Sequence, residues 1–219
     1  MAQQNIITLN NVSHSYGQNK PALSHIQLQI PIGSFVLVTG HSGAGKSTLL
    51  KIMRGDIVPS VGDVYVHGFP VRNFSNDDRS LLKQSTGFID QDPAFLGTMT
   101  VRENLHFFAE MNQYPKHDSD LLLERVGLSH TIHMYPSELS RGQRQILQSV
   151  RAIMHKPFLL IADEPIAHLD DIFTQALVSL FLDLQKSGST IVVASHKVDV
   201  FSDFNAVVKI RLEKGMQIT

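Results

Sequence analysis

The sequence predicts an α/β fold with a mainly parallel core sheet and an inserted helical lobe, and three observations support this prediction. Short apolar runs of strand length alternate with segments of helical periodicity, as in parallel sheets whose strands are connected by helices. The chain has 219 residues, of which 42% are hydrophobic and 18% charged, so it is long and apolar enough to bury a full core. The middle of the chain shows helical periodicity from Thr100 to about Ala152.

The first half of the chain contains most of the predicted strands and one predicted helix. A helical pattern over residues 46–54 follows a glycine-rich turn and ends at Gly55, a typical helix stop. Residues 62–66 alternate in character, as expected for a short strand of an exposed sheet. The strands expected in this half cover residues 6–12, 26–30, 34–39, 62–66 and 86–90.

The second half combines helices with two more buried strands. A loop at residues 111–118 separates two helices that are predicted from apolar residues at helical spacing, Val101, Leu105 and Phe108 in the first and Leu121, Leu122 and Val126 in the second. Apolar strands at residues 158–162 and 190–194 enclose a helical pattern at residues 172–185. The alternation of strands and helices therefore resumes after the helical segment.

The composition excludes several classes of protein. The chain has no cysteine, so disulfides, iron–sulfur clusters and cysteine–zinc sites are excluded. The net charge is −1, so no electrostatic attraction to nucleic acid is expected. No apolar run approaches the roughly 20 residues of a spanning helix, and residues 1–5 lack the pattern of a signal peptide. If the protein acts at a membrane, we expect a partner to hold it there.

A glycine-rich segment after the third predicted strand has the residues that bind phosphate. The match to G-x-x-x-x-G-K-[ST] consists of Gly40, His41, Ser42, Gly43, Ala44, Gly45, Lys46 and Ser47. Glycines let backbone N–H groups turn toward phosphate oxygens, and the start of the following helix adds a favourable dipole. We expect Lys46 to neutralise the β- and γ-phosphates and Ser47 to offer its hydroxyl to Mg²⁺. A ligand-free glycine-rich turn is the alternative, and the match at every fixed position argues against it.

An acidic pair follows the apolar strand at residues 158–162. Asp163 and Glu164 therefore stand at the carboxyl end of a parallel strand, where such sheets bind ligands. We expect Asp163 to hold the hydration shell of Mg²⁺ and Glu164 to polarise the attacking water. Taken alone, such a pair at a strand end is more often two solvated acids than a catalytic pair, but its combination with the phosphate loop favours catalysis.

One short segment identifies a family. Residues 139–143, Leu-Ser-Arg-Gly-Gln, resemble the L-S-G-G-Q signature of the ATP-binding cassette (ABC) ATPases, which is more specific than the phosphate loop. Further residues resemble other elements of this family, in the expected order: Tyr16 the aromatic that stacks on adenine, Gln91 the Q-loop glutamine, Ala167 to Asp170 the D-loop, and Ser195-His196 the switch histidine. The resemblance extends from Tyr16 to about Lys214.

The resemblance implies a fold and a chemistry. The fold is that of a P-loop NTPase, with residues 92–152 as the helical lobe and residues 1–91 and 153–219 as a RecA-like core with an antiparallel β subdomain. The implied reaction is hydrolysis of ATP with Mg²⁺ as cofactor, catalysed by Lys46, Gln91, Glu164 and His196, with Ser47, Gln91 and Asp163 near the metal. The residues implied to bind ATP besides the phosphate loop are Tyr16, Thr48, Ser140, Gly142, Gln143 and Asp170.

The resemblance also implies partners. Two cassettes enclose two ATP molecules, each between one phosphate loop and the opposite signature, so a second copy of the chain is expected. Residues 39–51 and 81–92 look most like the FtsE family, which works with the integral membrane protein FtsX in bacterial cell division. We therefore expect a partner resembling FtsX, bound to the helical lobe, and a peripheral location on the cytoplasmic face of the bacterial inner membrane. Nucleic acid is not an expected partner.

Some features depart from the family pattern, and other functions stay open. Arg141 replaces a signature glycine and either reaches phosphate on the opposing copy or points to solvent, while Ile146 stands where a basic residue is usual. Residues 164–170 align equally well with ATPases of lipoprotein release and macrolide export, so a transporter ATPase is the main alternative. A soluble cassette acting on nucleic acid, ribosomes or cluster assembly is a further one. A small kinase or GTPase would share the phosphate loop but not residues 139–143.

Overall fold

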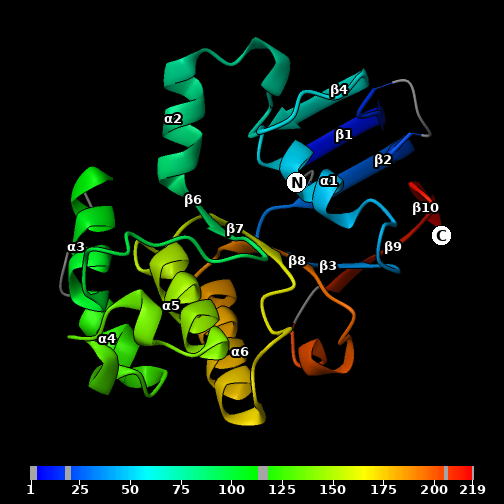
Figure 1. Ribbon diagram of the computed structural model, residues 1–219. Helices are drawn as coiled ribbons and strands as arrows, with labels where there is room; N and C mark the ends of the chain where they lie inside the picture. The colour runs from blue at the N-terminus through cyan, green and yellow to red at the C-terminus, as the bar shows by residue number, and fades with distance from the viewer. Residues whose placement is uncertain (1–3, 18–20, 113–117, 205–206, 219) are drawn as a thin grey trace.

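Ten strands form one continuous, curled sheet in the computed structural model, within the described residues 4–17, 21–112, 118–204 and 207–218 (Figure 1). Across the sheet the strands follow the order β5-β4-β1-β2-β10-β9-β3-β8-β7-β6. The strands are β1 (Asn5–His14), β2 (Leu23–Pro31), β3 (Phe35–Thr39), β4 (Val61–Val66), β5 (Phe69–Pro70), β6 (Thr86–Ile89), β7 (Leu159–Asp163), β8 (Thr190–Ala194), β9 (Val207–Glu213) and β10 (Met216–Ile218). The helices are α1 (Lys46–Met53), α2 (Asn76–Ser85), α3 (Val101–Met111), α4 (Asp118–Arg125), α5 (Arg141–Ile153) and α6 (Asp171–Lys186).

The centre of the molecule is a parallel group of five strands, β9, β3, β8, β7 and β6. Successive residues of β3 enter different apolar clusters, because side chains alternate between the two faces of a strand. Phe35 and Leu37 join the cluster that contains the buried residues of α5 and α6, whereas Val36 and Val38 join the one around α1. Both faces are covered, so the strand is apolar throughout. The predicted parallel core sheet is confirmed.

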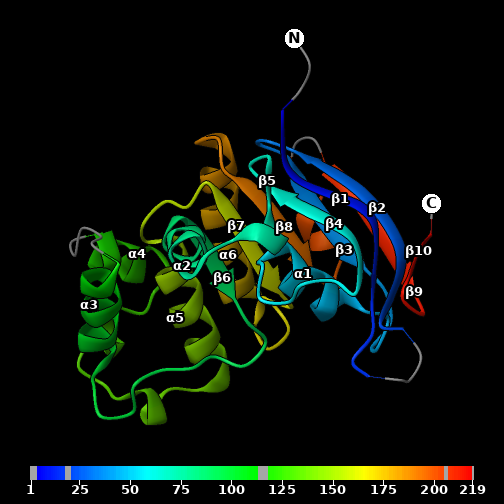
Figure 2. The same cartoon turned by 90° about the horizontal axis from the view of Figure 1, so that it is seen from above.

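The strands at the other side of the sheet are antiparallel. β1 pairs antiparallel with both β2 and β4, and β5 pairs antiparallel with β4. Along β2, buried residues such as Leu28 and Ile30 alternate with exposed ones, and they share an apolar cluster with Leu49 and Ile52 of α1. Figure 2 shows this antiparallel part at the opposite side of the molecule from α3 and α4. The expected antiparallel β subdomain is therefore present.

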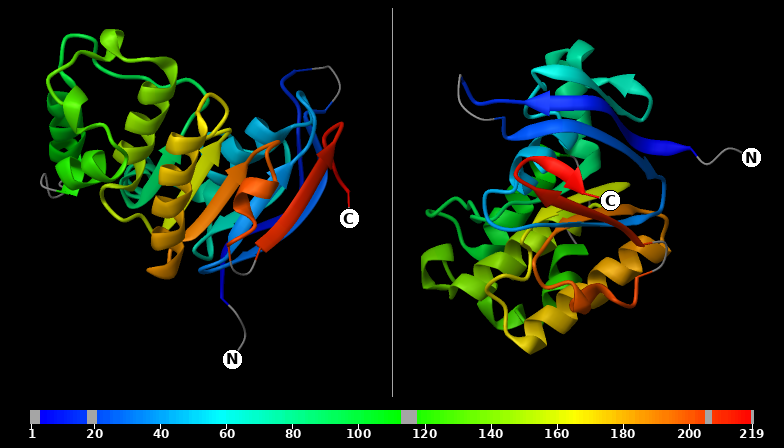
Figure 3. Two further views of the ribbon diagram at one scale, coloured as in Figure 1. Left: turned by 90° about the horizontal axis from the view of Figure 1, so that it is seen from below. Right: turned by 90° about the vertical axis from the view of Figure 1, so that its right-hand side faces the viewer.

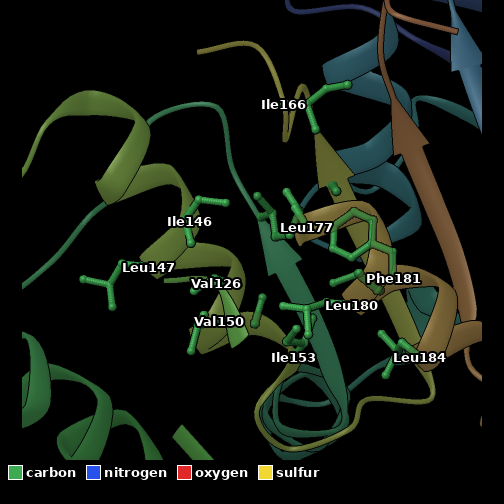
Figure 4. Packing of buried hydrophobic residues seen from close by; sticks show 14 of the residues in the cluster. Val126, Ile146, Leu147, Val150, Ile153, Ile166, Leu177, Leu180, Phe181 and Leu184 are labelled. Atoms are coloured by element: carbon green, nitrogen blue, oxygen red, sulfur yellow. The ribbon is translucent and has the colours of Figure 1, made fainter. Parts of the chain in front are cut away.

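Helices α3, α4 and α5 lie together at one end of the molecule, away from the β9–β10 hairpin (Figure 3). Buried side chains of α5 and α6, among them Ile146, Val150 and Leu177, meet in one apolar cluster (Figure 4). Leu105 of α3 and Leu123 of α4 belong to the same cluster. Residues 113–117 of the predicted loop lie outside the described residues. Among the described residues, no helix has both the length and the apolar character needed to cross a membrane.

Four elements were not predicted from the sequence, namely α2, the two-residue strand β5, β9 and β10. Helix α2 has only two apolar residues, the adjacent Leu81 and Leu82, so its sequence shows no apolar repeat at helical spacing, although Ser75 and Asp78 form a capping box at its start. The hairpin of β9 and β10 completes the link between the parallel strands and β2. In β9 only Ile210 and Leu212 are fully buried, which makes the apolar signal of this strand weak.

Candidate nucleotide site

The phosphate loop is the turn between β3 and α1, and its shape requires glycine. Gly40, Gly43 and Gly45 have φ angles of +151°, +76° and +101°, a range that other residues rarely adopt. A Cβ atom on Gly45 would lie 2.5 Å from the carbonyl oxygen of Ala22, and one on Gly40 would overlap the carbonyl oxygen of Leu212. Gly40 and Gly45 are therefore needed because Leu212 of β9 and Ala22, just before β2, leave no space for a side chain.

The confinement of the loop extends to the turn of the β9–β10 hairpin. The N–H group of Gly215 donates to the carbonyl oxygen of Ala44 over 3.1 Å, and the Gly215 carbonyl accepts from the N–H group of Ser24 over 2.7 Å. The hairpin turn thus contacts the phosphate loop on one side and β2 on the other.

The loop forms one wall of a cavity of about 670 Å³. Four segments meet there because each follows the carboxyl end of a neighbouring parallel strand, β3, β6, β7 or β8. The residues around the cavity are Ala22, Gly40 to Thr48, Gln91, Asp163, Glu164, Ala167, His168 and His196. The structure therefore brings together the predicted phosphate loop, Gln91, the acidic pair and His196. Ala22, which no motif contains, contributes through its place beside the loop.

Glu164 is held by two groups of the cavity. Its Oε2 lies 2.9 Å from Nδ1 of His196, and its Oε1 lies 3.9 Å from Nζ of Lys46. The backbone of Glu164 has a φ angle of +47°, and its N–H group donates to the carbonyl oxygen of Ala194 over 2.8 Å. A positive φ at a residue other than glycine is unfavourable and concentrates at functional sites. The carboxylate is therefore aimed into the cavity at a conformational cost.

The side chain of Lys46 also contacts the phosphate loop itself. Its Nζ donates to the carbonyl oxygen of Gly40 over 2.7 Å, besides its proximity to Glu164. An ammonium group in this position can exchange these partners for phosphate oxygens, which are stronger acceptors.

Asp163 and Ser47 form an oxygen-rich corner of the cavity. Burial raises the pKa of the Asp163 carboxyl, while the hydrogen bond from Ser47 lowers this pKa; the negative charge of Glu164 raises it and the positive charge of Lys46 lowers it. Hydroxyl and carboxylate oxygens are the ligands that Mg²⁺ prefers, and this ion keeps several waters. Within the described residues no group of three or more acidic or histidine side chains could hold a metal alone. The donor set therefore fits a Mg²⁺ ion that phosphate oxygens and water complete.

Five of the residues expected to bind ATP lie outside this cavity, namely Tyr16, Ser140, Gly142, Gln143 and Asp170. Tyr16 is 61% exposed, and its hydroxyl is 3.4 Å from Oγ1 of Thr48, in the helix that follows the phosphate loop. Its ring packs edge to face with that of His14, with 4.8 Å between the ring centres, and the residue is accessible from solvent beside the loop.

The signature residues Ser140, Gly142 and Gln143 surround the start of α5. The Ser140 hydroxyl accepts from the N–H group of Gln143 over 3.1 Å, and the Gln143 side chain accepts from the N–H group of Ser140 over 2.9 Å, a capping box. A Cβ atom on Gly142 would lie 3.0 Å from the carbonyl oxygen of His168, in the segment that precedes α6. Asp170 caps α6 by accepting from the N–H group of Phe173 over 2.8 Å. The exposed Arg141 stands beside these groups.

Comparison with known proteins agrees with this geometry. The sequence profile of the ABC transporter family matches residues 23–167. The chain belongs to this family. It is an ATPase of the ABC type, since solved ABC cassettes, one of them in a post-hydrolysis state bound to ADP and Pi, share its fold.

Two relatives illustrate the similarity in sequence. The cell division ATP-binding protein FtsE of Haemophilus influenzae is 35% identical over 200 residues, covering 89% of this chain and 92% of that protein. The uncharacterized ABC transporter ATP-binding protein MJ1508 of Methanocaldococcus jannaschii is 33% identical over 214 residues, covering 94% and 96%. Both alignments extend over most of each chain.

Two solved structures illustrate the similarity in fold. The dimeric structure of the cassette MJ0796 superposes with a TM-score of 0.89 at 26% identity, covering 97% of both chains. Its post-hydrolysis dimer, bound to ADP and Pi, superposes with a TM-score of 0.86 at 27% identity, again covering 97% of both. The P-loop ATPase fold expected from the sequence is thereby confirmed.

Proposed function

We propose that the chain is the ATPase subunit of an FtsEX-like membrane complex, in which closure of an ATP-bound dimer acts on a membrane partner during bacterial cell division. The observation that carries this proposal is the similarity to FtsE, 35% identical in Haemophilus influenzae and 32% in Escherichia coli K12, over about nine-tenths of the chain. A transporter ATPase of the lipoprotein-release or macrolide-export type is the second candidate. MJ1508, which is named an ABC transporter protein, is similar to nearly the same degree.

The proposed chemistry follows from the cavity. Lys46 exchanges its contacts with Gly40 and Glu164 for the β- and γ-phosphates. Glu164, freed from Lys46 and still beside His196, accepts a hydrogen bond from the attacking water and increases its nucleophilicity. Gln91 and His196 contact the γ-phosphate and the water from the neighbouring strand ends. Ser47 and Asp163 would hold Mg²⁺, and the ion would neutralise negative charge on the phosphates.

A second copy of the chain completes the proposed site. The N–H groups at the start of α5 and the Ser140 hydroxyl lie outside the chain's own cavity, and a helix N-terminus favours an anion. The solved cassette MJ0796 is dimeric. Two copies facing each other place Ser140, Gly142 and Gln143 of one beside the γ-phosphate bound by the other. Hydrolysis removes this shared ligand and loosens the dimer.

The proposed location is the cytoplasmic face of the inner membrane, through a partner that resembles FtsX. The surface offered to this partner is the helical lobe, residues 92–152, next to Gln91. Nucleic acid is not a proposed partner, since the net charge is −1.

The test is affinity capture of the Glu164→Gln chain from its native membranes in the presence of ATP, with mass spectrometry of the captured proteins. Recovery of a small four-span protein with a large extracytoplasmic loop, together with division factors, supports the FtsEX-like function. Recovery of a larger permease or of lipoprotein machinery assigns the chain to transport instead. The Lys46→Ala chain, which is expected not to bind ATP, is the control, because capture that depends on the closed dimer must be lost with it.

A further inference from the structure

The segment that carries Gln91 is attached to helix α5 by a buried glutamine. Gln148 lies in the middle of α5, which packs against β6, and its side chain is only 1% exposed. With its Nε2 toward the carbonyl oxygen of Asp90 and its Oε1 toward the N–H group of the same residue, the amide makes two hydrogen bonds of 3.0 and 2.7 Å. These partners assign the orientation of the amide, because the opposite one would pair donor with donor. Asp90 directly precedes Gln91.

The side chain of Asp90 is held from the opposite direction. It forms an ion pair with Arg54, the C-cap residue of α1. The guanidinium group of Arg54 also pairs with Asp56 over 2.9 Å and lies 4.2 Å from the ring centre of Phe88. Asp90 therefore connects the helix that follows the phosphate loop with the helix that follows the signature.

A second contact from α5 holds the chain beyond Gln91. Arg151 donates to the carbonyl oxygen of Ala94 over 2.6 Å, and its guanidinium lies 4.9 Å and 4.3 Å from the ring centres of Phe95 and Phe108. Gln148 and Arg151 are three positions apart, so they lie on one face of the helix. Gln91 thus lies between two backbone anchors, at Asp90 and at Ala94, that come from the same helix.

We propose that Gln148 is a positioning residue for ATP hydrolysis. It fixes the peptide groups next to Gln91, so that the Gln91 side chain faces the phosphates and moves together with α5, whose first turn carries the signature. Arrival of the second copy at that turn is then transmitted along one helix to Gln91. This inference rests on the proposed role of Gln91 in the cavity.

The experiment combines substitutions at both positions. Gln148→Met keeps the shape of the side chain and removes both hydrogen bonds, and it is expected to lower kcat about tenfold while the KM for ATP stays within about twofold. Gln145→Met is the matched control, because Gln145 is a glutamine on the same helix, 2% exposed, without a hydrogen bond to Asp90. Its kcat should stay at the parental value.

A double-mutant cycle separates positioning from simple stabilisation. If Gln148 acts through Gln91, adding Gln148→Met to Gln91→Ala lowers kcat no further. A full tenfold loss in both backgrounds, or no loss in either, overturns the inference. If Gln91→Ala itself keeps the parental kcat, the proposed role of Gln91 fails instead.

A second variant serves if the methionine variant does not fold, as judged by its thermal melting. Gln148→Ala leaves space for water to bind the peptide groups of Asp90, and it enters the same cycle. An equal loss of kcat in the presence and absence of Gln91 contradicts the inference for this variant too.

Discussion

The phosphate loop and the signature turn both precede a helix, but they use their polar groups differently. The loop before α1 lies against Ala22 and Leu212 and opens into a cavity that Glu164 and His196, which we propose to be catalytic, also line. In the turn before α5, Ser140 and Gln143 form a capping box that satisfies two backbone N–H groups, and both residues lie outside that cavity. One chain therefore has a phosphate loop that opens into its own cavity and a second helix start that lies outside it. Under the proposed function, this difference predicts that one copy suffices to bind ATP, whereas hydrolysis needs two.

The largest effect is expected at Glu164. Glu164→Gln keeps the size of the side chain but removes the base, so kcat should fall at least 100-fold, on the order expected for a general base. ATP affinity should be retained, and ATP-bound dimers should accumulate on size-exclusion chromatography. Glu124→Gln, an exposed change on α4, is the control. Parental turnover of the Glu164→Gln chain would show that another group activates the water.

Lys46→Ala tests whether the phosphate loop of one copy is sufficient to bind ATP. Loss of the ammonium group removes charge-assisted hydrogen bonds to two phosphates, so ATP affinity should fall about 100-fold. Titration calorimetry of the isolated chain measures this. Lys51→Ala, an exposed lysine on the same helix, should bind ATP normally. Equal affinities of the two variants would contradict the assignment of the phosphate loop.

Gly142→Ala tests whether hydrolysis depends on the signature turn of a second copy. The added Cβ atom would lie 3.0 Å from the carbonyl oxygen of His168 and disturb the signature turn, so kcat should fall about tenfold, as after loss of one transition-state donor. ATP binding by one copy should not change. Gly97→Ala, with no atom within 4 Å of its new Cβ, is the control.

Mixing the two kinds of variant sharpens this test. A Lys46→Ala copy keeps an intact signature, and a Gly142→Ala copy keeps an intact cavity, so a mixed dimer contains one complete site. Activity should rise on mixing above that of either variant alone. No gain on mixing would mean that the signature acts within its own chain.

A smaller effect is expected at Arg141, which stands beside the signature donors. Arg141→Gly removes a positive charge next to Ser140 and Gly142, which the proposed dimer would turn toward the second copy, and we expect kcat and the apparent affinity for ATP to change about threefold. Arg141→Lys should stay closer to the parental values. Unchanged affinity and turnover in the glycine variant would indicate that the Arg141 side chain points to solvent and does not contact phosphate.

The smallest effect concerns stability rather than turnover. Burial raises the pKa of Asp163 above its unfolded value of 3.8, so the ionised carboxyl opposes folding at neutral pH. This opposition is relieved as the pH falls through the raised pKa toward the unfolded value. Asp163→Asn should therefore raise the Tm of the nucleotide-free chain by about 2 °C near neutral pH. Calorimetry should find a smaller difference at about pH 4, and a lowered Tm at neutral pH would contradict the prediction.

Much of the site could be predicted from the sequence because its residues directly follow apolar segments that are recognisable as strands. Glu164 and His196 each follow an apolar strand, and the glycines around Lys46 have no other common use in that position. The same reasoning fails where the signal is not local. Gln148 is a polar residue within a helix, and nothing in its neighbours reveals that it contacts Asp90. Helix α2 has only two apolar residues, and they are adjacent, so its sequence shows no apolar repeat at helical spacing.

The β9–β10 hairpin helps to fix the shape of the phosphate loop. Gly215 donates a backbone hydrogen bond to Ala44, and the carbonyl oxygen of Leu212 lies where a Cβ atom on Gly40 would be, although both residues lie more than 160 positions from the loop in the sequence. Substitutions that reshape this turn should therefore behave in a genetic screen like defects of nucleotide binding, without altering any charged group of the cavity. Insertions or fusions placed in that turn carry the same risk for anyone who builds a reporter from this chain.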